Sequence, residues 1–251
     1  MWGTLVKSSA KEAFRQISPW VLLGVVLVAS CAVGFLPVRL GDPTARHASN
    51  LIALQRFLGL LFAAIVAVPS VTPPSRFHFG APRWGPTPWG PHLASQSLFL
   101  GQAAVLAAFF ALCTLVQAGI LLLTGAHEPP RSWVGTLTST WFYGWGCLAL
   151  ARALAAWLSL RQTLSTFLAL TLLLPILLKG GGEISAVFVS LFPGPSWLSM
   201  TGADPSMEPR RALLHATSAT LFIVACNLLA AHGLARNHLG ARGLDRRNSK
   251  A

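Results

Sequence analysis

The sequence has few charged residues, and very few of those are acidic. Only 10% of its 251 residues are Asp, Glu, Lys or Arg, with 7 acids against 19 Lys and Arg. A soluble domain averages about 25% charged residues. The acids are also scattered, so the chain offers no pair of carboxylates for general acid–base catalysis. This shortage of charge argues against a soluble enzyme.

Cysteines and catalytic motifs are equally scarce. All four cysteines (Cys31, Cys113, Cys147 and Cys226) lie in apolar stretches, without a CxxC or a nearby His. Neither a disulfide framework nor a zinc site is therefore expected. No Walker A, HExxH, GxSxG or GxGxxG string occurs, and the run 180–182 is three glycines without the Lys of a phosphate loop. We expect no catalytic residue, no metal and no cofactor bound by this chain.

Long uncharged apolar runs dominate what is present. Hydrophobic residues make up 53% of the chain, and six such runs contain no Lys, Arg, Asp or Glu: 16–38, 57–75, 84–127, 132–151, 162–178 and 212–235. About 20 apolar helical residues cross a bilayer. We therefore predict one domain of six membrane-spanning helices, placed at about 20–37, 53–72, 96–124, 133–158, 162–179 and 212–235. Little of the chain is left for a soluble domain.

The basic residues predict an orientation for these spans. With the N-terminus inside, 12 Lys and Arg fall on the cytosolic side and 7 on the outer side. The positive-inside rule favours that arrangement, with both termini cytosolic. It also accounts for the net charge of +12 without a nucleic-acid partner.

Two segments outside the spans have distinctive patterns. Residues 2–18, within a predicted unit 1–19, place apolar and basic residues on opposite helical faces, as an interfacial helix does. A seventh uncharged run contains Pro193-Gly194-Pro195, which would break a helix. We therefore predict an outer re-entrant or interfacial hairpin over 184–200. The membrane domain covers 20–235, and 236–251 form a basic cytosolic tail.

The main cytosolic loop, 73–95, is rich in proline, tryptophan and basic residues. Two interpretations remain open. It is either an interfacial loop with a tryptophan belt or a docking surface for a cytosolic partner. In the second case the contact residues are Arg76, Phe77, Arg83, Trp84 and Trp89.

A few polar and small residues inside or next to the spans are candidates for helix packing or for a pathway. Thr136, Thr140 and Gly144 form a four-residue stripe that permits close helix contact. Glu183 follows the fifth span and either lines a pathway or marks the outer interface. Asn227 lies in the last span, where a lone polar residue most often bonds to a neighbouring helix.

The order of these parts resembles that of the permease subunit of type-2 ABC exporters. Leu5-Val6-Lys7 and residues 11–15, before Pro19-Trp20, resemble its interfacial elbow helix, and 97–102 resemble the beginning of its third span. Residues 161–178, with Leu174-Pro175-Ile176-Leu177, resemble its fifth span, and 184–200 match its outer hairpin in position. Residues 96–178 are most similar to the heme exporter B-type subunit of cytochrome c maturation.

The resemblance implies an all-α integral membrane protein with an elbow helix, six transmembrane helices and an outer re-entrant hairpin before the last span. It implies a multi-pass protein of the bacterial inner membrane that forms the translocation pathway of an exporter. ATP would be hydrolysed by a separate cytosolic ABC ATPase subunit, and the permease would form a homodimer or pair with a similar permease. The transported substrate is not indicated.

A second hypothesis comes from a different class. The chain would be a non-transporting membrane assembly or anchor protein, for example in heme or metallocofactor handling. Its nine Trp and seven His would serve that role, with His78 and His92 as the histidines to change. A heme absorbance that depends on these two residues would distinguish this hypothesis from a permease.

Overall fold

The computed structural model describes residues 2–15, 17–35, 43–67, 90–123, 130–174 and 209–248, and none of these residues lies in a β-strand. The chain is therefore helical throughout the part described, in agreement with the predicted class. The helices are α1 (Trp2–Arg15), α2 (Ile17–Phe35), α3 (Pro43–Phe62), η1 (Ala63–Ala67), α5 (Gly90–Leu123), α6 (Pro130–Ala155), α7 (Leu160–Leu168), η2 (Ala169–Leu173) and α10 (Pro209–Asn248).

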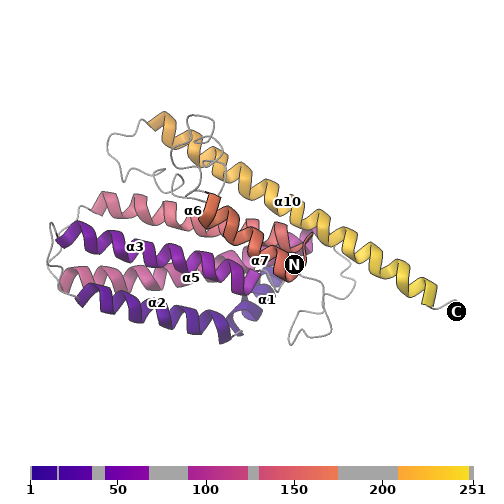
Figure 1. Cartoon of the computed structure of the whole chain (residues 1–251), viewed down its shortest axis with the longest axis horizontal. Helices are drawn as coiled ribbons and strands as arrows, with labels where there is room; N and C mark the ends of the chain where they lie inside the picture. The colour runs from indigo at the N-terminus through magenta and orange to yellow at the C-terminus, as the bar shows by residue number, and fades with distance from the viewer. Residues whose placement is uncertain are drawn as a thin grey trace.

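Helices α2, α3, α5 and α6 run side by side and alternate in direction (Figure 1). Helix α10 crosses this group and packs on α5 and α6. Helix α1 packs mainly on α5 at one end of the bundle, and the last turns of α10 extend beyond that same end (Figure 1). Only residues 36–42 separate α2 from α3 and only 124–129 separate α5 from α6, and connections this short favour antiparallel neighbours.

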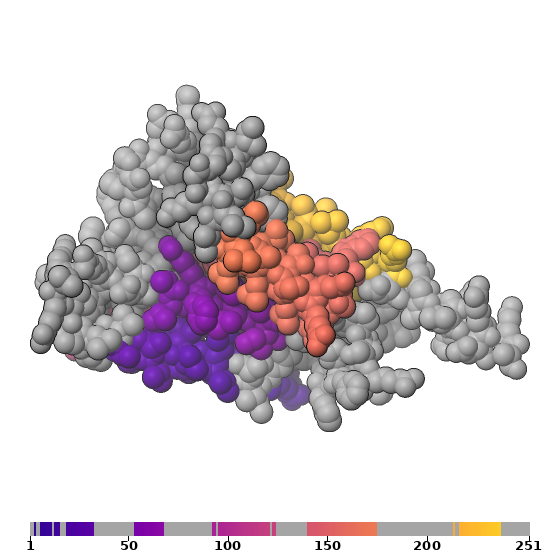
Figure 2. Space-filling view, viewed as in Figure 1, coloured from indigo at the N-terminus to yellow at the C-terminus, as the bar shows by residue number. Residues whose placement is uncertain are grey.

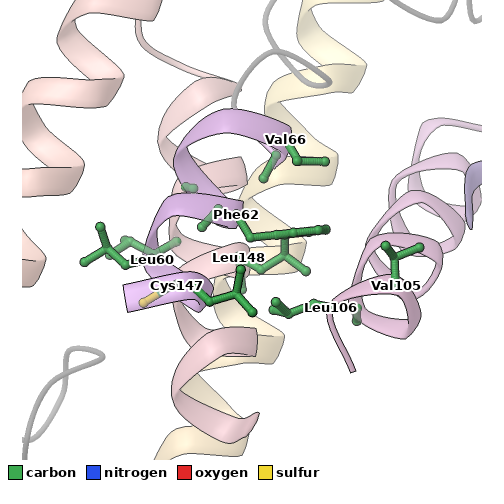
Figure 3. Close-up of a cluster of buried hydrophobic side chains, with 14 of the residues drawn as sticks. Leu60, Phe62, Val66, Val105, Leu106, Cys147 and Leu148 are labelled. Atoms are coloured by element: carbon green, nitrogen blue, oxygen red, sulfur yellow. The ribbon is translucent and has the colours of Figure 1, made fainter. Parts of the chain in front are cut away.

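Apolar side chains from α3, α5 and α6 form the centre of the bundle. Figure 3 shows Phe62 of α3 next to Leu148 of α6, with Leu106 of α5 close to both. Phe62, Leu106 and Leu148 are completely buried. Small residues allow the helices to approach, and close packing of this kind holds helices together where both the core and the surroundings are apolar.

Among the residues that the structure describes, two helices are long and apolar enough to cross a membrane, over Ser95–Ile120 in α5 and Ala216–Arg236 in α10. A third candidate is the pair Val6–Arg15 and Pro19–Ala32, which is bent by 65°. Ala53–Ala67 is a shorter apolar helix. Large apolar side chains are widely exposed, as with Leu115 (71%) and Leu122 (78%). These features indicate a helical membrane protein.

Several helices extend beyond the predicted spans, and proline explains where they begin. Pro43, Pro130 and Pro209 are the first residues of α3, α6 and α10, and Pro91 is the second residue of α5. Proline suits the first turn of a helix because its missing N–H would have no intrahelical partner there. Consequently α3 begins ten residues before position 53, and residues 90–95 of the predicted loop are helical. Helix α10 continues through most of the predicted tail.

The segment predicted as the fifth span begins with a capped helix. The Gln162 side chain accepts hydrogen bonds from the Ser159 N–H and hydroxyl, at 3.2 and 2.9 Å, where α7 begins. After Leu168 the chain continues as the π-helical segment η2, a form that often marks functional positions. The predicted hairpin over 184–200 lies outside the described residues.

Candidate functional site

The residues predicted from the sequence fall into three groups. Arg76, Phe77, Arg83, Trp84, Trp89 and Glu183 lie outside the described residues. Thr136 lies in the first part of α6, and the structure describes its backbone but not its side chain. Thr140, Gly144 and Asn227 are described in full, and they belong to two separate places in the bundle.

Gly144 lies where α6 crosses α3 and α5. A Cβ added at Gly144 would come within 2.7 Å of the Phe110 ring, and one added at Gly59 would lie 3.1 Å from the Gly144 Cα. Thr140, one turn earlier, is completely buried. Two glycines on facing helices thus let α3 and α6 meet backbone to backbone against one aromatic ring.

Asn227 belongs to a second place, centred on a buried arginine. Arg152 on α6 is completely buried and is the largest such side chain among the described residues. Its Nη1 donates to the Asn227 Oδ1 of α10 at 3.0 Å. Its Nη2 donates to the carbonyl and hydroxyl oxygens of Ser95 on α5, at 2.7 and 3.1 Å. We call Ser95, Arg152 and Asn227 the arginine clamp.

The Arg152 guanidinium is surrounded by neutral groups in the arginine clamp. The guanidinium also lies over the Phe99 ring, at 5.6 Å from its centroid, a cation–π contact that strengthens when water is excluded. Arg152 Nε has no hydrogen-bond partner among the described residues. A buried guanidinium is costly unless its donors have hydrogen-bond acceptors. Because the acceptors come from α5 and α10, the bonds to Arg152 fix the positions of these two helices relative to α6.

Of the three clamp residues, the sequence analysis singles out Asn227, for which it predicts a bond to a neighbouring helix, and does not identify its partner. Nothing in the spacing connects residues 75 positions apart. Nothing in the sequence marks Ser95 as a partner of Arg152. Its shorter bond is made by the backbone carbonyl, which every residue type has.

A second polar cluster lies farther along α5, where it packs on α2 and α3. Gln55 Nε2 donates to Gln117 Oε1 at 2.7 Å and to Thr114 Oγ1 at 3.0 Å. Gln117 Nε2 donates to Ser30 Oγ at 3.2 Å. We call these four residues the glutamine cluster; Gln55, Gln117 and Ser30 are fully buried. The cluster links α2, α3 and α5 by hydrogen bonds in place of apolar packing alone.

Helix α1 is fixed to the bundle by small residues and aromatic rings. Ser9 and Ala13 are buried, whereas Lys7, Lys11 and Arg15 are exposed. A Cβ added at Gly101 of α5 would lie 2.6 Å from Ser9 Cβ and 2.8 Å from the Ala10 backbone nitrogen. The buried face therefore includes Ser9, which the apolar pattern did not identify.

An aromatic cluster closes the bend between α1 and α2. The rings of Phe14 and Trp20 lie 5.7 Å apart, and both contact Phe109 of α5, at 5.9 and 5.3 Å between centroids. Trp20 Nε1 also donates to the Phe14 carbonyl at 2.6 Å. Phe62 of α3 completes the group at 6.0 Å from Phe109.

Histidine and cysteine side chains do not gather into a metal site in the part described. Among these residues no group of three or more His, Cys, Asp or Glu could hold a metal ion. Cys113, Cys147 and Cys226 are buried and Cys31 is exposed, all as free thiols. The arginine clamp and the glutamine cluster instead join helices by hydrogen bonds.

No protein-family model matches the chain, and no curated protein matches it.

Proposed function

We propose that this chain is the membrane-spanning permease subunit of an ABC-type exporter, driven by a separate ATPase. The observation that carries the proposal is the placement of α1. An amphipathic helix with exposed lysines bends by 65° into an apolar helix and packs on α5 around Gly101. Helix α5 follows directly after the proline-rich loop, so the elbow helix would contact the same helix that the coupling loop leads into.

In this proposal the chain supplies the pathway and the partner supplies the energy. ATP binding by the partner would push on the loop before Gly90. The arginine clamp joins the first turns of α5 to α6 and α10, and Gly101 fixes α1 against α5. A displacement of the loop would therefore move four helices together. Nucleotide binding would then shift the population between inward-open and outward-open arrangements.

The proposal includes a six-span topology with both termini cytosolic, in the bacterial inner membrane. Two copies, or this chain and a similar permease, would face each other across the pathway. Candidate ATPase-contact residues are Arg76, Phe77, Arg83, Trp84 and Trp89. Thr136, Glu183 and the described Thr140, Gly144 and Asn227 would pack helices or line the pathway. The distribution of Lys and Arg and the absence of a phosphate-binding motif in the sequence support this division of labour.

The test is recovery of an ATPase with the full-length chain. We expect the tagged protein, solubilised in detergent from its native membranes, to retain a Walker-motif ATPase that mass spectrometry identifies. Replacing Arg83 and Trp84 by Ala should reduce its recovery by about tenfold or more, equivalent to about 1.4 kcal/mol. A matched control replaces Arg39 and Arg46, which the predicted topology places on the outer side.

Two outcomes would contradict the proposal. One is the absence of any such ATPase from the intact protein when membranes are shown to contain it. The other is equal loss of the ATPase in the loop variant and in the outer control, because contact would then not be specific to the cytosolic side.

A further inference from the structure

Trp157, just after the end of α6, and two residues of α10 form an exposed aromatic and cationic surface. The indole of Trp157 stacks on the His232 ring with 5.8 Å between centroids and 28° between planes. Arg236 Cζ lies 5.8 Å from the Trp157 ring centroid. Trp157 is 44% exposed, and His232 and Arg236 are exposed as well. We call these three residues the tryptophan platform.

The tryptophan platform is held rigidly by the helix crossing beneath it. Trp157 Nε1 donates to the Leu229 carbonyl at 3.1 Å. A Cβ added at Gly233 would lie 2.7 Å from Ala156 Cβ and 3.0 Å from Trp157 Nε1. The indole is thus fixed against the backbone of α10, and its orientation does not depend on a bound partner.

An apolar stripe leads along α10 to this platform. Leu221, Val224 and Leu228 are exposed at 64%, 50% and 54%. Continued at the same three- and four-residue spacing, the stripe reaches His232 and Arg236, so all five share one helical face. In Figure 2 this part of α10 (yellow) is visible at the surface beside the end of α6 and α7 (orange). The face changes from apolar to cationic where the Ala216–Arg236 span ends.

We propose that this face is a binding site for an anionic phospholipid. The phosphate would bind between Arg236 and His232, and an acyl chain would lie along Leu221, Val224 and Leu228. Charge complementarity selects the headgroup, since an arginine and an aromatic side chain at a span end meet lipid phosphates at that depth. The apolar stripe favours a lipid over a free phosphate, because a free phosphate has no acyl chain to pack on the leucines. The proposal requires a membrane protein but is independent of any transport activity.

The experiment measures lipid binding by the full-length protein. The purified, delipidated chain is titrated with phosphatidylglycerol or with phosphatidylcholine of the same acyl chains, and bound lipid is counted by native mass spectrometry. We expect phosphatidylglycerol to bind at least about tenfold more tightly than phosphatidylcholine. Arg236→Gln should remove most of this preference, because each nearby basic residue attracts an anionic surface by about a fivefold factor and the platform adds a directed contact.

Arg15→Gln is the matched control, since Arg15 is an exposed arginine at the end of another helix. It should leave the lipid preference within about twofold. Leu228→Ser tests the contribution of the apolar stripe. It should weaken the binding of phosphatidylglycerol without changing the binding of glycerol 3-phosphate. Circular dichroism of each variant without lipid establishes that the fold is retained.

Three results would overturn the proposal. They are equal binding of the two lipids, equal loss in the Arg236 and Arg15 variants, and binding of glycerol 3-phosphate as tight as that of phosphatidylglycerol. The last would mean that the site recognises a free phosphate.

Discussion

At the scale of single residues, polar side chains connect helices that are otherwise apolar. Arg152 bonds to Ser95 and Asn227 on two other helices, and Gln55 bonds to Gln117 across α3 and α5. A buried polar group is costly when it loses its partner and nearly neutral when both partners are replaced by apolar groups. The arginine clamp and the glutamine cluster should therefore show strong pairwise coupling.

Asn227→Ala is expected to destabilise the protein by about 1.5–3 kcal/mol, the usual value of a hydrogen bond to a charged group. The reason is that the Arg152 guanidinium stays buried with one acceptor fewer. In an Arg152→Met background the same change should cost less, because no charge is left to satisfy. Thermal unfolding in detergent, followed by circular dichroism, measures the four proteins of this cycle. Additive effects, within about 0.5 kcal/mol, would contradict the coupling.

The glutamine cluster gives a second prediction of this kind. Gln117→Leu should destabilise by about 1–3 kcal/mol, since Gln55 Nε2 loses its 2.7 Å acceptor while remaining buried. The double variant Gln55→Leu, Gln117→Leu should recover part of that loss. Gln96→Leu, at an exposed position of α5, serves as the control. If the double variant loses more unfolding free energy than the two single variants together, the hydrogen bond between Gln55 and Gln117 is contradicted.

At the scale of elements, glycines and prolines decide where helices begin and how closely they meet. Pro43, Pro130 and Pro209 begin helices that hydropathy alone placed later. The bend after α1 is closed by Phe14, Trp20 and Phe109. Gly101 then allows α1 to approach α5 at backbone distance. Local residue chemistry thus acts at the ends and crossings of helices.

Gly101→Ala and Gly119→Ala should have opposite effects, although both lie in α5. A methyl group at Gly101 would collide with Ser9 and the Ala10 backbone, so α1 must shift, at about 1–3 kcal/mol. Gly119 has nothing within 4 Å, and Ala there should stabilise the helix by about 0.5–1 kcal/mol. Thermal unfolding of both variants is the measurement. Equal effects at the two positions would exclude the close contact between α1 and α5.

At the scale of the whole molecule, the bundle has two distinct ends. Helix α1, the end of α6 and the last turns of α10 lie at one end (Figure 1). The arginine clamp and the tryptophan platform also join α6 to α10. Helix α10 has 40 residues, about 60 Å at 1.5 Å per residue. That length exceeds the bilayer core of about 30 Å, so α10 must project into water or tilt.

A topology measurement should place both termini on the same side of the membrane. Green fluorescent protein fused after Ala251, or before Met1, is expected to fluoresce, because it folds in the cytosol. Alkaline phosphatase fused after residue 40 is expected to be active, because the connection between α2 and α3 would be outside. Fluorescence from only one terminus would contradict an even number of spans.

The sequence by itself determined the helical class and the membrane setting, because long uncharged runs allow few other structures. It also marked Gly144 and Asn227 as residues of interest. It did not determine the partners, since Ser95, Arg152 and Asn227 come together only when α5, α6 and α10 pack. Helix beginnings at proline, the burial of Ser9 and the tryptophan platform were likewise decided by tertiary structure. The physical reason is that hydropathy reports how apolar a segment is, whereas contact between distant helices depends on which faces and backbones meet.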